Sequence, residues 1–268
     1  MLQPLDREKL RSEFTTAKPF PYVKIDNFID PAKAQAIAAA YPSFDVALNQ
    51  GRTFSTVNER KKIQISDASK YAAPIAELNA LLASESFLND LSYITNIPKL
   101  LADDQLVGGG IHVTGPGGRL DVHIDFNFIE ERKLHRRLNL LVYLNSPWED
   151  SWGGQFQLWD KEVKYCEATF SPVFNRCVIF ETSEISYHGV VPISPDAPFP
   201  RKSFATYYYT REPPAHWTGI SHSTIFKARP DEKLKSAVLM PAETAKRKVD
   251  ALMNKLKRGI KGAISGQH

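Results

Sequence analysis

Two residues near the middle of the chain, His123 and Asp125, form a His-x-Asp pair whose side chains would point the same way along a β-strand. The spacing alone is weak evidence, because 7 His and 30 Asp or Glu in 268 residues produce roughly 0.8 such pairs by chance. A third candidate ligand, His188, lies between two predicted strands further along the chain. Two neutral imidazoles and one carboxylate suit Fe(II) and leave three positions open for a bidentate co-substrate and O2.

A cation downstream of His188 could anchor such a co-substrate. If the co-substrate is 2-oxoglutarate, its far carboxylate needs a positive partner, and Arg201 opens the last predicted strand in FPRKSFATYYYT. A guanidinium binds a carboxylate through two parallel hydrogen bonds, which Lys does less well. Alternation along the strand predicts that Ser203 shares the face of Arg201 and that Lys202 points the opposite way.

Other kinds of site are disfavoured. Cys166 and Cys177 are not placed as zinc ligands, and two cysteines cannot form a disulfide framework. The Gly-rich segments lack the G-x-G-x-x-G pattern of a dinucleotide-binding loop, and no G-x-S-x-G motif supplies a hydrolase nucleophile. His135 lies in a charged segment and is expected to be solvated, whereas His112 is expected to be a hydrogen-bonded interior residue.

The elements that must position these residues are strands. Between residues 105 and 212, short β-rich runs alternate with turns rich in Gly, Pro, Asn and Asp, and no helical pattern separates them. This succession of short strands and turns predicts an antiparallel sandwich or barrel of jelly-roll type, so the predicted fold class is mainly β with helical flanks. The predicted strands are 105–114, 120–128, 136–145, 153–160, 176–182, 186–193 and 203–210.

Residues 1–104 are predicted to be a mostly helical supporting region with one early strand at 20–28. Asp30 followed by Pro31 reads as a helix N-cap with Pro in the first turn, which predicts a helix over 31–41. The segment 69–83 is amphipathic, and Ser84 is positioned to cap one more helix.

From about 105 to 212 the chain resembles the catalytic domain of the prolyl 4-hydroxylase-like Fe(II)/2-oxoglutarate-dependent dioxygenases. VTGPGGRLDVHIDFN resembles the family's Gly-rich turn and His-x-Asp strand, and RRLNLLVYLNSPWEDSWGGQFQLWD resembles the next two strands. PVFNRCVIFETSEISYHGVVPI resembles the stretch that ends in the distal iron histidine. RKSFATYYYT resembles the final strand, which opens with the basic residue that binds 2-oxoglutarate.

The resemblance implies a double-stranded β-helix (jelly-roll, cupin-like) in which His123, Asp125 and His188 bind Fe(II). The residues that it implies for 2-oxoglutarate are Arg201 and Tyr143 at the C5 carboxylate, with Asn139 and Leu141 facing the co-substrate. It also implies hydroxylation of an unactivated C–H bond with release of succinate and CO2, and it makes ascorbate a further candidate cofactor. Thr114 stands where many members have Tyr, so no role is carried over to it.

Several alternatives stay open at this point. The substrate is a prolyl residue or a small molecule such as a sugar or glycolipid, and fold analogy cannot choose between them. The rival function is a non-catalytic jelly-roll module that binds a metal or ligand. His123 and Asp125 could be a half-exposed strand pair, Arg201 a surface salt-bridge residue, and Tyr143 a core residue.

The region 213–268 is predicted to be a connector and a basic amphipathic C-terminal helix. Residues 227–268 hold eleven Lys or Arg and four Asp or Glu, a net charge of +7, which leaves −3 for the rest of the chain. The tail would pack on the barrel or a second protomer, or lie on an anionic membrane. Nucleic acid is disfavoured because Ser203 and Arg211 break the R-x-N-x-x-x-x-x-R pattern of the nucleic-acid-repair branch. The N-terminus lacks an apolar signal region, so a cytoplasmic location is expected, with peripheral membrane contact as an addition.

Overall fold

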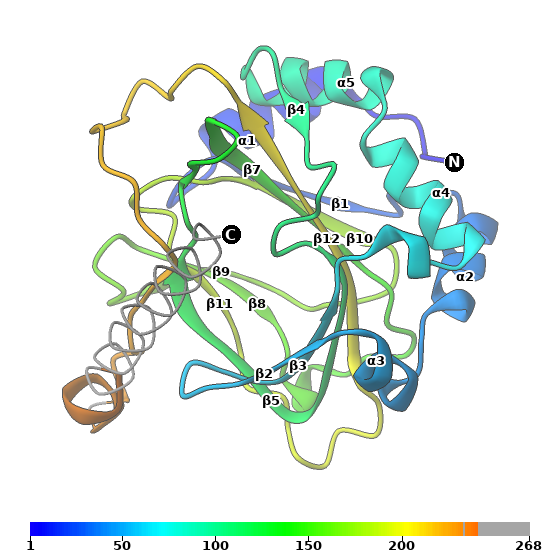
Figure 1. Cartoon of the computed structure of the whole chain (residues 1–268), viewed down its shortest axis with the longest axis vertical. Helices are drawn as coiled ribbons and strands as arrows, with labels where there is room; N and C mark the ends of the chain where they lie inside the picture. Colours follow the sequence, from blue (N-terminus) through cyan, green and yellow to red (C-terminus); the bar gives the residue numbers. More distant parts are fainter. Residues whose placement is uncertain (233, 241–268) are drawn as a thin grey trace, which may run out of the picture.

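The computed structural model describes residues 1–232 and 234–240 and shows a curled β-sheet with helices gathered along one side (Figure 1). The α-helices are α1 (Arg7–Thr16), α2 (Pro31–Ala40), α3 (Phe44–Gln50), α4 (Ala73–Leu82) and α5 (Glu85–Thr95). Short helical turns cover Ala68–Lys70, Asp150–Trp152 and Lys235–Leu239. The predicted tail helix over 241–268 lies outside the described residues.

The strands of the sheet come from the whole length of the described chain. They are β1 (Tyr22–Asp26), β2 (Arg52–Ser55), β3 (Glu59–Ile65), β4 (Leu101–Ala102), β5 (Gly110–Ile124), β6 (Phe128–Ile129), β7 (Leu134–Tyr143), β8 (Phe156–Trp159), β9 (Cys166–Phe170), β10 (Arg176–Glu181), β11 (His188–Val190), β12 (Arg201–Thr210) and β13 (Ile225–Phe226).

The helix starts follow the capping chemistry of the sequence. The Asp30 side chain accepts a hydrogen bond from the Lys33 amide, with Pro31 in the first turn, and the Ser84 side chain accepts one from the Phe87 amide. Both predicted helix starts are therefore confirmed. The apolar faces of these helices pack on the sheet, where Phe14, Ile37 and Leu91 join one buried cluster. This layer covers one wall of the barrel.

Strand β5 belongs to both walls of the barrel, and this sharing closes the fold. Its first half pairs with β12 and β3, and its last residues pair with β11 and β13. The main path through the sheet runs β1-β10-β7-β12-β5-β11-β8-β9, with all these pairings antiparallel. A bend at Gly115–Gly118 redirects the strand, and a Cβ on Gly118 would lie 2.7 Å from the Gly115 carbonyl oxygen. The arrangement is the predicted double-stranded β-helix.

The prediction of a single strand in residues 1–104 is wrong, because β2 and β3 form a hairpin that pairs with β5. Ile63 and Ile65 of β3 are buried in the apolar core, and the alternate residues Lys62 and Gln64 line a cavity on the other face of the strand. The inward face of this hairpin is polar because it borders that cavity, so the usual apolar signal of a strand is half missing. In the described part of the chain, no helix has the length and apolar character needed to cross a membrane.

Candidate metal and co-substrate site

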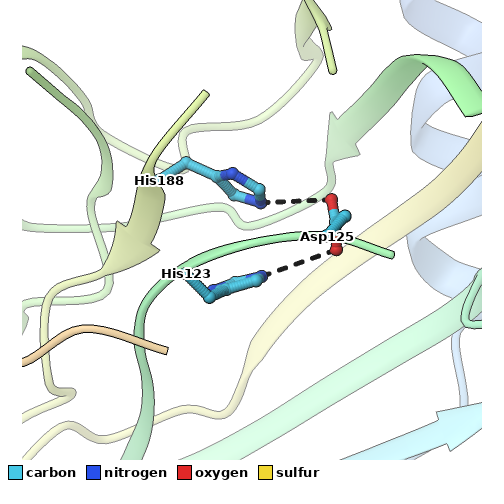
Figure 2. A group of neighbouring side chains, drawn as sticks. All are labelled: His123, Asp125 and His188. Carbon is cyan, nitrogen blue, oxygen red and sulfur yellow. Dashed lines mark ion pairs between the residues drawn. The ribbon is translucent and has the colours of Figure 1, made fainter. Parts of the chain in front are cut away.

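The three predicted metal ligands lie together inside the barrel (Figure 2). His188 of β11 sits directly opposite His123 of β5 in the strand register, and their rings are 4.3 Å apart. Asp125 follows the end of β5, so its carboxylate faces both rings. Antiparallel pairing between strands that are distant in sequence therefore brings the residues together.

The donor atoms converge on one point. The Nε2 atom of His123 lies 3.6 Å from Oδ1 of Asp125, and the Nε2 atom of His188 lies 3.5 Å from Oδ2. The three ligand atoms all lie within 4.8 Å of one another. Two nitrogens and one carboxylate oxygen at this spacing fit a divalent ion such as Fe(II).

Hydrogen bonds fix which nitrogen of each histidine is available to a metal. Nδ1 of His123 lies 2.8 Å from the Asp121 carbonyl oxygen, and Nδ1 of His188 lies 2.9 Å from that of Ser186. A carbonyl oxygen can only accept, so each Nδ1 carries the proton and donates it. The lone pair of each ring is then on Nε2, the atom that faces the site.

Burial sets the charge of the ligands. Burial, reinforced by the neighbouring His123, lowers the pKa of His188 to about 3, so its ring is neutral as metal binding requires. Burial opposes ionisation of Asp125, yet Arg136 and the two histidines hold the pKa of this carboxyl well below its usual range. The site therefore offers the neutral ring of His188 and an ionised Asp125 carboxylate.

A closed polar network holds the far oxygen of Asp125. Oδ2 accepts a hydrogen bond of 2.7 Å from the Asn139 side chain and lies 3.1 Å from Nη2 of Arg136. Nε of Arg136 donates to Oδ1 of Asn139 at 2.9 Å, which closes a triangle. The guanidinium also lies over the Tyr207 ring, with Cζ 3.6 Å from its centroid. Because Oδ2 is engaged in this way, Oδ1 is the oxygen best placed for a single bond to a metal.

Sequence reasoning missed Arg136, and the reason is a β-bulge. In the pairing of β7 with β12, Leu138 faces Tyr208 and Arg136 faces Tyr209, so Arg137 is an extra residue without a partner in the register. Without the bulge, residues 136 and 139 would lie on opposite faces of the strand. The available signal in the sequence was an arginine at the head of the apolar run RRLNLLVYLN.

Arg201 lies at the opposite end of the co-substrate region, where β12 begins. It is buried, and its Nε donates to the Gly154 carbonyl oxygen at 2.8 Å. Its Nη1 lies 3.4 Å from the Ser203 hydroxyl. A Cβ on Gly154 would lie 3.1 Å from the Cδ atom of Arg201, so the missing side chain at this position makes room for the arginine. Ser203 also lines the cavity, as predicted.

Tyr143 packs beneath Arg201 rather than on the cavity surface. The Arg201 Cζ atom lies 4.9 Å from the Tyr143 ring centroid, and Asn139 and Leu141 of the same strand line the cavity. Burial raises the pKa of Tyr143 to about 12, against the opposing effect of Arg201, so the hydroxyl stays protonated. Its oxygen has no hydrogen-bond partner among the described residues. A buried donor without a partner beside a buried arginine suits an incoming carboxylate.

His112 and His135 lie inside the fold. His112 lines the cavity with its Nε2 atom 3.1 Å from the Gly108 carbonyl oxygen, and burial lowers its pKa well below the usual range. Thr114 also lines the cavity. The prediction that His135 is solvated is wrong, because its ring lies 4.6 Å from that of Phe128 and 4.7 Å from that of Trp217. The connector after β12 folds back over this face and buries it.

One cavity of about 810 Å³ is bordered by the three predicted metal ligands, by Arg201 and by the β2–β3 hairpin. The hairpin contributes Arg52, Phe54 and Lys62, and the connector contributes Thr224 and Phe226. The Phe226 ring lies 5.3 Å from the ring of His123. A volume in this range accommodates a small-molecule ligand.

Comparison with known proteins agrees with this geometry. Residues 109–209 match the family model described as the 2OG-Fe(II) oxygenase superfamily. A prolyl 4-hydroxylase from Pseudomonas putida is 17% identical with a TM-score of 0.52, over 75% of this chain and 99% of that one. A prolyl hydroxylase from Trichoplax adhaerens, solved with a hypoxia inducible factor peptide fragment, is 18% identical with a TM-score of 0.55. The match covers 76% of this chain and 90% of that one. At these identities the two structures show a shared fold. Comparison with curated protein sequences finds no significant match.

Proposed function

We propose that this chain, whose residues 109–209 match the 2OG-Fe(II) oxygenase superfamily, is a 2-oxoglutarate-dependent dioxygenase that hydroxylates an unactivated C–H bond of its substrate. The observation that carries the proposal is the meeting of His123, Asp125 and His188 at one end of a cavity that reaches Arg201. When bound, Fe(II) supplies the chemistry that couples O2 to oxidation of 2-oxoglutarate, giving succinate, CO2 and a hydroxylated product.

The residues of the chain have distinct tasks in this proposal. Nε2 of His123, Nε2 of His188 and Oδ1 of Asp125 would hold the iron on one face and leave the other positions open. Asn139 and Arg136 hold Oδ2 of the carboxylate and so fix its orientation.

The co-substrate would lie along β7 between the metal and Arg201. Arg201 would bind the C5 carboxylate of 2-oxoglutarate, and the protonated Tyr143 hydroxyl would donate one more hydrogen bond. Asn139 and Leu141 border the path between them. The buried walls, with Phe156 and Phe180 against His188, exclude water from this end of the cavity.

The substrate that we propose is a prolyl residue or a small molecule such as a sugar or glycolipid. The two structural neighbours are prolyl hydroxylases, one of them with a bound peptide, which supports a prolyl substrate by analogy of fold alone. Ascorbate remains a proposed accessory cofactor.

For residues 241–268 we keep the proposal of peripheral contact between a basic tail and an anionic membrane, in a cytoplasmic protein. Partition of the full chain and of a chain without residues 241–268 onto anionic vesicles tests it. Equal partition of the two proteins would end this part of the proposal.

One assay tests the proposed function against a non-catalytic binding module. Anaerobic protein is mixed with Fe(II) and 2-oxoglutarate, and the weak visible charge-transfer band of the complex is measured. We expect the band, followed by succinate release when O2 is admitted. Folded protein without the band, or with the band but with no succinate release across a panel of prolyl peptides and metabolites, would favour the binding module.

A further inference from the structure

The β2–β3 hairpin carries a cationic platform on the face that borders the cavity. Phe54 lies directly opposite Lys62 in the strand register, and Arg52 precedes Phe54 by two residues on the same face. The Arg52 Cζ atom lies 4.8 Å from the Phe54 ring centroid, and the Lys62 Nζ atom lies 5.1 Å from it. All three side chains line the cavity. The hairpin therefore presents an aromatic ring between two positive charges.

The cavity as a whole has a surplus of positive charge. Counting histidines as neutral, the described residues that line it include five cations and two carboxylates, which leaves three positive charges in excess. The cations are Arg52, Lys62, Arg119, Arg136 and Arg201, and the carboxylates are Glu59 and Asp125. Fe(II) carries two positive charges and 2-oxoglutarate carries two negative charges, so binding of both leaves this surplus unchanged.

Most of these cations already have a partner within the protein. Lys62 lies 2.8 Å from Glu59, and Arg119 lies 2.7 Å from Asp121. Arg136 is paired with Asp125, and 2-oxoglutarate would supply the partner of Arg201. Arg52 makes no ion pair with any residue in the described ranges.

A ligand that fills this cavity would remove water from Arg52 and Lys62. Loss of hydration from a charged group is costly unless an opposite charge replaces the water. A neutral ligand would incur that cost at the hairpin, whereas an anionic group placed between Arg52 and Lys62 would offset it with charge-assisted hydrogen bonds.

We propose, on the premise of the function above, that the substrate is a small organic anion whose carboxylate or phosphate binds between Arg52 and Lys62, with the adjoining part of the molecule against Phe54. The cavity of about 810 Å³ has room for 2-oxoglutarate and one further small molecule. The hairpin precedes residues 109–209, the part that matches the oxygenase family, so this preference belongs to a region outside the matched domain.

The test uses the full chain loaded under nitrogen with Fe(II) and saturating 2-oxoglutarate, so that Arg201 is already occupied. Phenyl phosphate, benzoate and neutral benzamide are the probes, and calorimetric titration measures their affinities. The probes share a ring that can lie against Phe54 and differ in charge, so the tighter anion distinguishes a phosphate from a carboxylate site. We expect at least one anion to bind about tenfold more tightly than benzamide.

Two variants that each remove one positive charge, Arg52→Gln and Arg60→Gln, test whether the anion binds at the cavity face of the hairpin. Arg52→Gln should weaken binding of the tighter anion about tenfold, and Arg52→Lys should retain most of it. Arg60→Gln is the matched control, because Arg60 is exposed on the same hairpin and does not line the cavity. It should leave anion affinity within about twofold. Circular dichroism and thermal unfolding check the fold of each variant.

The proposal is overturned if benzamide binds as tightly as both anions, if no probe binds, or if Arg52→Gln and Arg60→Gln behave alike. Failure of the proposed function is a separate result. In that case the wild-type protein gives no charge-transfer band with Fe(II) and 2-oxoglutarate before any probe is added.

Discussion

The two ends of the cavity are built differently. At the metal end, hydrogen bonds to the backbone hold His123 and His188, which are almost completely buried. A hydrogen bond from Asn139 and an ion pair with Arg136 hold Asp125. At the hairpin end, Arg52 is exposed and Phe54 and Lys62 are partly exposed. The metal end lies within the match to the oxygenase family, whereas the hairpin lies before it.

This difference separates a fixed chemical centre from a surface that can select a ligand. Buried polar groups that satisfy one another specify a single geometry, and removal of one member leaves the others without partners. Exposed cations keep their water when a neighbour changes, so single substitutions there cost little stability. The comparison predicts large effects on iron and 2-oxoglutarate at the metal end and small ones at the hairpin.

The largest expected effect comes from the ligands themselves. His188→Ala removes one of the two nitrogen donors and should reduce Fe(II)-dependent succinate formation to the level of the protein without iron. Metal analysis after anaerobic loading measures the loss of bound iron. Unchanged iron content and turnover in a folded variant would exclude His188 as a ligand.

Arg136→Met should have the next largest effect. It removes the ion-pair partner of Asp125, and it removes the N–H group that donates to the Asn139 side-chain oxygen. We expect Fe(II) affinity or turnover to fall about 10- to 100-fold. Arg137→Met is the matched control, since Arg137 is the bulge residue and pairs with Glu181 instead. If the two variants lose equal iron affinity, the network around Asp125 has no specific role.

Arg201→Lys should affect the co-substrate and spare the metal. It keeps the charge but loses the planar fork, so the KM for 2-oxoglutarate should rise about tenfold with Fe(II) affinity unchanged. Lys202→Gln, at the next residue, lies on the opposite face of β12 and provides the control. An unchanged KM in Arg201→Lys would mean that another residue binds the C5 carboxylate.

The smallest effect is expected on the outer side of the hairpin. Arg60→Gln should change Fe(II) affinity and the KM for 2-oxoglutarate by less than about twofold, because the side chain is exposed and does not line the cavity. Titration of the charge-transfer band with Fe(II) measures the first quantity, and the rate of succinate release at varied 2-oxoglutarate measures the second. A large change would mean that the two ends of the cavity are coupled through β3 and β5.

The sequence predicted the parts of the site that depend on residue type and on simple alternation. His-x-Asp on one strand, a distant histidine and an arginine at the head of the last strand follow the period of a β-strand and the chemistry of Fe(II) and carboxylates, and the resemblance to the dioxygenase family joined them into one site. The barrel follows from the run of short strands and turns between residues 105 and 212. The structure places His123, Asp125 and His188 together, as that pattern implied.

The parts that could not be predicted depend on irregular pairing and on long-range folding. The bulge at Arg137 changes the face on which Arg136 lies, and no local sequence signal fixes the position of a bulge. His135 is buried by Trp217, which comes from a connector more than eighty residues away. The β2–β3 hairpin borders a cavity, so Lys62 and Gln64 replace the apolar residues by which an inward strand face is recognised.

The most direct measurement is a crystal structure of the protein grown anaerobically with Fe(II) and 2-oxoglutarate, with anomalous diffraction recorded at the iron edge. The account predicts one iron peak within bonding distance of Nε2 of His123, Nε2 of His188 and Oδ1 of Asp125, with the C5 carboxylate of 2-oxoglutarate on Arg201. An iron peak elsewhere in the molecule, or a C5 carboxylate directed away from Arg201, would contradict it.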